Sequence, residues 1–236
     1  MNKKLTYYGF FAFILLLFGC SIGTLDNDPG YIGWNYFPLD SGSYRVYHVT
    51  DITYTLGGVT DTSKYFLKET ITGPYDNLER NVSFRISREV KAIDGENWEQ
   101  DSIWWAKKDL KTAVVVENNI PIIKLVFPLK ENKSWDANTE NVLEEDMYML
   151  KNVGMAITDT SGIGASYEKT VIIEQESIND NIIYKDQRTE IYAENIGMVY
   201  KERIFLNYCD EDDCRGQNII DTGTDFRMVL LENGKD

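Results

Sequence analysis

The stretch VSFRISREVKA, residues 82–92, places apolar side chains at even positions and polar side chains at odd positions. Arg88 is the one even position that breaks the pattern. A period of two is typical of a β-strand, in which successive side chains point to opposite faces of the sheet. The stretch YRVYHVTDITYTL, residues 44–56, has the same period, and we expect its even positions, among them Val46 and His48, to face the core.

Alternating or apolar runs of strand length recur along most of the chain. They lie at residues 60–71, 97–108, 111–117, 120–127, 167–176, 182–193, 198–208 and 225–232. The pairs Gly57-Gly58, Asp94-Gly95 and Asn118-Asn119 lie between such runs and are typical of hairpin turns. Ten or more antiparallel strands with short connections predict an all-β fold, in which a curved antiparallel sheet forms a β-sandwich or an open barrel. We assign residues 34–236 to a single β-rich domain.

At most one short helix is expected in the mature chain, within residues 139–151. Asn138 or Thr139 would cap it, and Glu144 and Glu145 fall early in the segment. The run at residues 147–150 is equally typical of a strand, so we expect a short helix or an irregular segment followed by a strand.

The first twenty residues have the features of a secretion signal. Lys3 and Lys4 precede an apolar run, residues 5–18, that is shorter than the roughly 20 residues a membrane span needs. The sequence LFGC, residues 17–20, resembles the lipobox of bacterial lipoproteins, which implies cleavage before Cys20 and lipidation of that cysteine. Residues 1–19 are then a lipoprotein signal peptide and residues 20–33 a lipidated tether. An ordinary signal peptide with an unrelated cysteine is the alternative.

A lipidated Cys20 predicts an outer-membrane lipoprotein of the cell envelope, held in the membrane by its acyl chains. Asp26 and Asp28 resemble the acidic stretch that directs some Bacteroidota lipoproteins to the cell surface, so a periplasmic and a surface-facing position both stay open. The chain has 38 acidic and 24 basic side chains and a formal charge of −14. This acidity argues against a nucleic-acid partner and against a basic surface for anionic lipid. We therefore expect the lipid anchor to make the membrane contact.

Four short motifs are spread along most of the domain. They are the opening Phe37–Tyr44, the mid-chain Phe127–Asp136, the strand Tyr192–Glu202 and the last strand Phe226–Leu231. Together they resemble a family of Bacteroidota lipoproteins, although Tyr44 stands where tryptophan is common in that family. The resemblance implies an all-β lipoprotein and brings no catalytic residue with it. Gly197, between two strand runs, is expected to allow a bulge or a close approach of the backbone.

Two cysteines remain once Cys20 is lipidated. Cys209 and Cys214 flank four acidic residues, and exported compartments are oxidising. We expect a disulfide between them, because a turning loop would bring their Cα atoms within the roughly 4.4–6.8 Å that the bond requires. Asp210 and Asp212 in this loop are weak candidates for a calcium site. The positions that follow break the EF-hand pattern, so we predict a solvated acidic loop and no metal.

Few residues of catalytic type occur in a recognisable arrangement. His48 is the only histidine, which excludes multi-histidine metal sites and HExxH proteases. Residues 162–166 have neither the order of an esterase nucleophile motif nor that of a phosphate-binding loop. Carboxylate pairs suited to glycoside hydrolysis are available among so many acids, and a hydrolase is the least favoured alternative. We predict a non-catalytic protein that requires no cofactor.

Trp104 and Trp105 are the candidate ligand-binding residues. Neighbours on a strand point to opposite faces, so we expect one indole in the core and the other outside, where it could stack on a sugar. Aromatic side chains also fill β-sheet cores, which is the simpler interpretation. The predicted function is a binding or structural module, for a glycan or another amphipathic ligand. An interaction subunit of an outer-membrane protein complex is the alternative.

Overall fold

The computed structural model describes residues 32–56, 59–76, 82–158, 165–180 and 182–235. The predicted signal peptide, Cys20 and the tether up to residue 31 lie outside the described residues. The Gly57-Gly58 turn and most of the segment 162–166 lie outside them as well.

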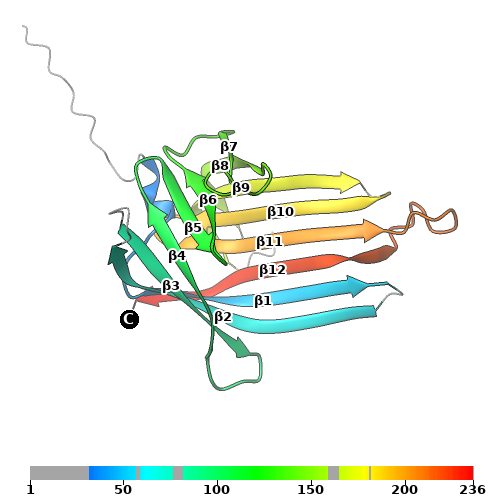
Figure 1. Ribbon diagram of the computed structural model, residues 1–236, viewed down its shortest axis with the longest axis horizontal. Coiled ribbons are helices and arrows are strands. Elements are labelled where there is room, and N and C mark those ends of the chain that lie inside the picture. The colour runs from blue at the N-terminus through cyan, green and yellow to red at the C-terminus, as the bar shows by residue number, and fades with distance from the viewer. Residues whose placement is uncertain (1–31, 57–58, 77–81, 159–164, 181, 236) are drawn as a thin grey trace, which may run out of the picture.

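The described residues fold into one antiparallel sheet of twelve strands, as the alternation in the sequence predicts (Figure 1). The elements in chain order are η1 (Trp34–Tyr36, a 3-10 helix), β1 (Ser43–Thr55), β2 (Val59–Asp76), β3 (Val82–Ala92), β4 (Glu99–Lys108), β5 (Thr112–Glu117), β6 (Ile120–Val126), β7 (Ser134–Asp136), β8 (Met147–Ile157), β9 (Tyr167–Asp180), β10 (Tyr184–Ala193), β11 (Gly197–Tyr208) and β12 (Ile220–Lys235). The strand order is β6-β5-β4-β3-β2-β1-β12-β11-β10-β9-β8-β7. The all-β prediction is therefore confirmed.

The two ends of this sheet meet. In Figure 1, strands β9 to β12 run beside β1 and β2, and β3 to β6 curl across one face of that layer. The backbone N–H of Ile123 on β6 donates to the carbonyl of Ala137, directly after β7, at 3.0 Å. The indole Nε1 of Trp135 on β7 donates to the Ile123 carbonyl at 2.9 Å. Of the two predicted architectures, the sheet adopts the barrel, which is nearly closed.

Local chemistry explains several connections. Asn118 and Asn119 join β5 to β6 with φ angles of 51° and 68°, the left-handed conformation that a tight hairpin turn requires. The segment after β7 turns rather than forming a helix, because the Asp136 carboxylate accepts the backbone N–H groups of Asn138 and Asp146. The expected irregular segment followed by a strand is thus confirmed over residues 137–157.

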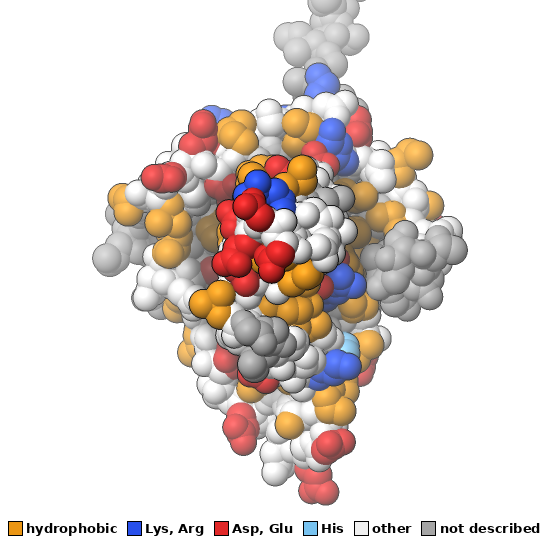
Figure 2. Space-filling model, turned by 90° about the vertical axis from the view of Figure 1, so that its right-hand side faces the viewer, with side chains coloured by type: hydrophobic (Ala, Val, Ile, Leu, Met, Phe, Trp, Pro, Cys, Tyr) orange, Lys and Arg blue, Asp and Glu red, His pale blue; other side chains and the backbone are white. Residues whose placement is uncertain are grey.

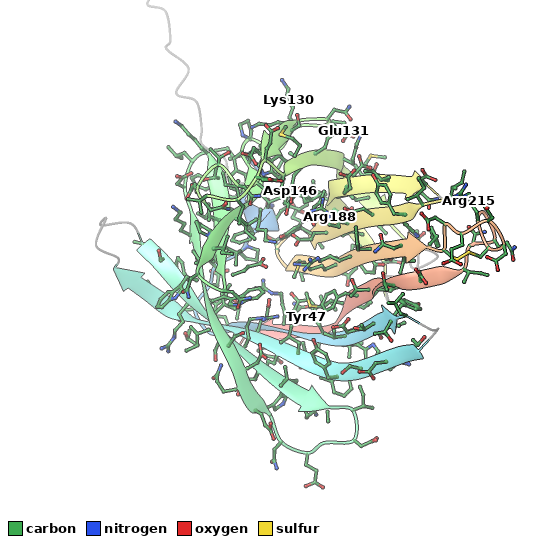
Figure 3. All side chains as sticks on the ribbon, turned by 45° about the vertical axis from the view of Figure 1, so that its right-hand side comes forward. Tyr47, Lys130, Glu131, Asp146, Arg188 and Arg215 are labelled. Carbon is green, nitrogen blue, oxygen red and sulfur yellow. A yellow bond between two sulfur atoms is a disulfide. The ribbon has the colours of Figure 1, made fainter. Side chains whose placement is uncertain are left out.

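The loop that carries Asp146 is tied to the wall of the barrel. Arg188 on β10 donates to the Asp146 carboxylate at 2.9 Å and also bonds Asp186 at 3.0 Å. Figure 3 shows Arg188 and Asp146 close together, with Tyr47 on the facing part of the sheet.

The sequence assigned the wrong face of β1 to the core. Tyr47 and Val49 are fully buried, whereas His48 is only partly buried and makes an edge-on contact with Phe66 at 6.0 Å. The inward-facing row also contains Arg45, because residues 45, 47 and 49 share one face of the strand. Apolar character did not identify the inward face of β1, because the interior of the barrel contains charged side chains.

Two clusters of buried side chains fill the barrel. The larger is shared by strands β3 to β10 and includes Leu125, Leu150 and Ile173, which are fully buried. The smaller joins β1, β2, β10, β11 and β12 around Tyr47 and Val49. Between them the interior is neither fully packed nor apolar. None of the helical segments among the described residues has the length and hydropathy that a membrane crossing requires.

Candidate functional site

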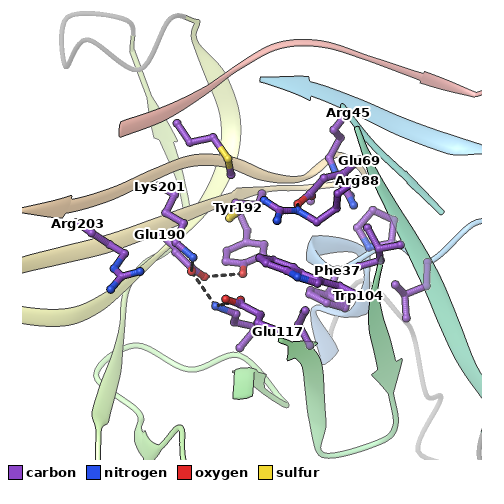
Figure 4. Close-up of a pocket in the computed structure, with 18 of the residues that line it drawn as sticks. Phe37, Arg45, Glu69, Arg88, Trp104, Glu117, Glu190, Tyr192, Lys201 and Arg203 are labelled. Carbon is purple, nitrogen blue, oxygen red and sulfur yellow. Dashed lines mark hydrogen bonds and ion pairs between the residues drawn. The ribbon is translucent and has the colours of Figure 1, made fainter. Parts of the chain in front are cut away.

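The interior of the barrel contains a cavity of about 220 Å³ that is partly open to solvent (Figure 4). Its apolar wall is formed by side chains that include Phe37, Ile86, Val115, Met198 and Met228. A cavity of roughly 150 Å³ in a protein core is large enough to bind benzene, so this one has room for a small organic molecule. The cavity is unusual in its polar lining, which consists largely of charged side chains.

Five of these polar side chains form one buried network. Glu190 on β10 is fully buried, and its carboxylate pairs with Lys124 at 2.9 Å and with Lys201 at 3.0 Å. The Tyr192 hydroxyl donates to the same carboxylate at 2.7 Å. Lys124 also pairs with Glu117 at 2.7 Å. Every charged member of the network therefore has an opposite charge beside it, as buried charges require.

The strand register places these groups together. Glu190 lies directly opposite Lys201 across the β10–β11 pair, and Tyr192 follows on the same face of β10. Lys124 comes from the other side of the barrel, where the β5–β6 register shifts: Ala113 pairs with Leu125 and Val114 with Ile123. That irregularity leaves Lys124 without a direct cross-strand partner and turns its ammonium group inward.

Electrostatics fix the protonation of the network. Burial alone would raise the pKa of Glu190, but Lys124 and Lys201 outweigh it and hold that pKa well below its usual range. Burial would likewise lower the pKa of Lys124, yet the Glu117 and Glu190 carboxylates raise it. The pKa of Glu117 is also lowered, because Lys124 and Lys201 overcome its desolvation. The Glu190 and Glu117 carboxylates and the Lys124 ammonium group are therefore charged at neutral pH.

A second polar group lies on the facing strands. Glu69 on β2 has Arg45 on one side, on β1, and Arg88 on the other, on β3. Arg88 forms the ion pair with Glu69, and its Nε lies 3.2 Å from Glu69 Oε1. Its guanidinium carbon lies 3.7 Å from the centre of the Trp104 ring. A cation at this distance over an indole face is a favourable contact. The row therefore contains two cations for one carboxylate.

The two candidate tryptophans separate as neighbours on a strand should. Trp104 lines the cavity, while Trp105 does not and lies on the other face of β4. The indole Nε1 of Trp104 is buried and has no hydrogen-bond partner among the described residues. Trp104 is thus brought to the cavity, and Trp105 is not.

Arg45 and Gly197 meet in the cavity wall. Arg45 donates through Nη1 to the Ile196 carbonyl at 3.1 Å, and its buried Nε has no partner among the described residues. Gly197 has a φ of 93°, and a Cβ at this position would lie 2.5 Å from Arg45 Nη1. The close approach expected at Gly197 is therefore present, and the neighbour is an arginine of the cavity.

We expect Gly197→Ala to lower the free energy of unfolding by about 1–3 kcal/mol, because alanine is strained at this φ and its Cβ would displace Arg45. Gly154→Ala is the matched control, since Gly154 has a φ of 74° but no atom of the described residues within 4 Å of the added Cβ. Denaturant titration of both variants measures the difference. Equal losses in the two variants would contradict the contact between residue 197 and Arg45.

The loop between β11 and β12 lies apart from the cavity. Cys209 and Cys214 form the disulfide that the sequence predicts, with their Cα atoms 5.8 Å apart. Asp210 and Asp212 are exposed, and Figure 2 shows acidic side chains gathered at this end of the molecule. Figure 3 places Arg215 at the tip of the loop. Within the described ranges, no three His, Cys, Asp or Glu side chains are grouped to hold a metal ion.

Sequence reasoning found Trp104 but missed the charged lining of the cavity. For three of these side chains a signal was present, a charge inside or next to an apolar or alternating run. Arg88 interrupts VSFRISREVKA, Lys124 interrupts IPIIKLV, and Glu190 precedes the buried run IYA. Arg45 gave no such signal, because it was placed on the wrong face.

Comparisons with known proteins give structural neighbours only. No protein-family model matches the chain, and no curated protein matches it. A protein from Bacteroides fragilis, described as exported and as having a YmcC-like fold, is 10% identical, with a TM-score of 0.44. A protein from Parabacteroides distasonis, described as a lipoprotein, is 12% identical, with a TM-score of 0.41. Each match covers 84% of this chain and 98% of the other. The family resemblance in the sequence motifs stays a prediction.

Proposed function

We propose that this chain is a lipid-anchored protein of the cell envelope that binds a small amphipathic molecule inside its barrel and does not transform it. The observation that carries the proposal is the cavity of about 220 Å³, which has an apolar wall and two buried donors, Arg45 Nε and Trp104 Nε1, that have no hydrogen-bond partner in the described part of the chain. Ligand sites commonly combine apolar walls with a few polar groups placed to orient the ligand.

The buried network supports a binding role by holding the cavity open. Glu190, Lys124, Lys201 and Tyr192 satisfy one another at 2.7–3.0 Å, so they form a rigid polar floor without any ligand. Arg45 Nε and Trp104 Nε1 differ from these groups, because neither has a hydrogen-bond partner among the residues that the structure describes. Such unpaired buried N–H groups are rare in native proteins. A bound molecule that presents acceptor oxygens would satisfy both.

The same network argues against hydrolysis. A glycosidase of the common type needs one carboxyl group with a raised pKa to protonate the leaving oxygen. Glu190 and Glu117 instead have lowered pKa values, because Lys124 lies between them and Lys201 is close by. Both carboxylates are thus poor proton donors at neutral pH, and we favour a binding protein over an enzyme.

Trp104 and Trp105 offer a matched test of the site. We expect native mass spectrometry of the full chain, gently released from the envelope, to find a small molecule bound to the wild-type protein. Trp104→Ala should reduce the bound fraction by about tenfold or more, since it removes the indole N–H and part of the wall. Trp105→Ala, on the opposite face of β4, should retain it. A wild-type protein without any bound molecule, or equal loss in the two variants, would overturn the proposal.

The anchor is tested separately at Cys20. We expect a clickable palmitate analogue to label the wild-type chain in growing cells and to leave Cys20→Ala unlabelled, because no other residue is expected to be acylated. Cys209→Ser is the control, since it removes a cysteine that lies in a disulfide. Equal label in the wild-type and Cys20→Ala chains would mean that the protein is not held by this residue.

A further inference from the structure

The cavity has an excess of positive charge, although the chain as a whole has a formal charge of −14. Five cationic side chains line it: Arg45, Arg88, Lys124, Lys201 and Arg203. Three carboxylates line it: Glu69, Glu117 and Glu190. All three carboxylates are already ion-paired, with Arg88, Lys124 or Lys201. Among the described residues, Arg45 and Arg203 are left without an ion pair.

The two unpaired arginines are not equivalent. Arg203 is exposed, so water solvates its charge. Arg45 is largely withdrawn from water, and its Nε is buried without a hydrogen-bond partner among the described residues. Its guanidinium contacts only neutral groups, the Ile196 carbonyl and the Tyr47 hydroxyl, among the described residues. Taking a charge out of water without an opposite charge beside it is costly. Glu69, directly across from Arg45, pairs with Arg88 and forms no ion pair with Arg45.

We infer that the ligand is a small amphipathic acid whose carboxylate pairs with the Arg45 guanidinium in the cavity. This rests on the proposed function, since it names the class of molecule that the same cavity binds. An apolar or ring-shaped body would lie against the wall that Phe37, Ile86 and Met198 help to form. The Trp104 Nε1 donates to a further oxygen of the ligand, and Arg203 attracts the acid from the solvent.

Matched pairs of probes separate charge from shape. The apolar pair is hexanoate and hexanamide, and the sugar pair is methyl β-D-glucuronide and methyl β-D-glucoside. Each pair keeps nearly the same size and differs in the carboxylate. Isothermal titration of the full lipidated chain in nanodiscs, with empty nanodiscs as the blank, gives the affinity of each probe. We expect the acid of at least one pair to bind about tenfold or more tightly than its neutral partner, and the preferred acid identifies a fatty-acid or a sugar-acid body.

Arg45→Gln tests the residue. It removes the charge but keeps a side chain able to donate, so we expect the preference for the acid to fall to within about threefold while the neutral probe binds as before. Arg85→Gln is the control, because Arg85 is exposed on β3 and its substitution changes the net charge by the same amount. Circular dichroism establishes that both variants are folded.

The outcomes distinguish the two proposals. If the neutral probes bind as tightly as the acids, or if Arg45→Gln keeps the full preference, the inference that the ligand is an acid is wrong and the proposed binding function stands. If none of the four probes binds and the isolated protein holds no small molecule, both proposals fail. A neutral molecule recovered with the wild-type protein would overturn only the inference that the ligand is an acid.

Discussion

Glu190→Ala is expected to lower the free energy of unfolding by about 3–5 kcal/mol, the range for breaking a buried ion pair by removing one partner. Glu190 is fully buried and holds Lys124 and Lys201 at 2.9 and 3.0 Å. Its removal leaves Lys201 without its carboxylate and Lys124 with Glu117 alone. Urea denaturation of the variant and the wild-type chain, followed by circular dichroism, measures the loss.

Glu140→Ala is the matched control, because Glu140 also pairs with a lysine, Lys107 at 2.8 Å, but both side chains are 33% exposed. We expect it to change stability by less than about 1 kcal/mol. A loss at Glu190 no larger than the loss at Glu140 would mean that the interior network does not stabilise the barrel.

The effect of Glu190 should depend on pH in one direction. Its folded pKa is lowered below the ordinary value of 4.5, so its contribution is complete above that value and is lost as the pH falls toward the folded pKa. We therefore expect the difference between wild-type and Glu190→Ala proteins to be constant from about pH 6 to 8 and to shrink below about pH 4.5. A difference that grows on acidification would contradict the lowered pKa.

Trp135→Ala is expected to cost about 3–5 kcal/mol and to open the barrel, because Trp135 joins the two edges of the sheet. Its side chain is 8% exposed, lies edge-on to Tyr148 at 5.9 Å, and donates to the Ile123 carbonyl on β6. Hydrogen exchange followed by mass spectrometry should show that the variant exchanges faster than the wild-type protein in β6 and β7. The increase should be smaller in β1 and β12, which lie in the middle of the sheet.

Trp135→Phe separates packing from the closing hydrogen bond. Phenylalanine retains much of the buried area but cannot donate, so we expect a loss of about 1–3 kcal/mol from the unsatisfied carbonyl and the reduced volume. If Trp135→Ala leaves the exchange of β6 and β7 unchanged, the closure depends on the backbone contact between Ile123 and Ala137 instead.

The strands could be predicted from the sequence where apolar and polar residues alternate with a period of two. Residues 82–92 form β3 over the same limits, and the asparagine pair 118–119 forms the expected hairpin turn. The pairing of the two sheet edges did not follow, because β7 is only three residues long, and its contact with β6 is set by the Trp135 indole.

The site was less accessible to sequence reasoning because it reverses the usual rule. Interior positions of a β-sheet are expected to be apolar, whereas Glu190, Lys124 and Arg45 point into this barrel. Arg88 shows what could have been used, since one charge in an otherwise apolar row indicates an interior partner rather than a solvated face. The partners themselves come from distant strands, since Lys124 and Glu190 are 66 positions apart in the sequence, so only the folded register reveals them.

The most direct measurement is a crystal structure of the full chain isolated from its own envelope. We expect continuous electron density for one organic molecule in the cavity, with an oxygen within hydrogen-bonding distance of Trp104 Nε1 and an acidic group beside Arg45. Separate water molecules on those two donors, in a protein whose Glu190–Lys124–Lys201 network is intact, would contradict it.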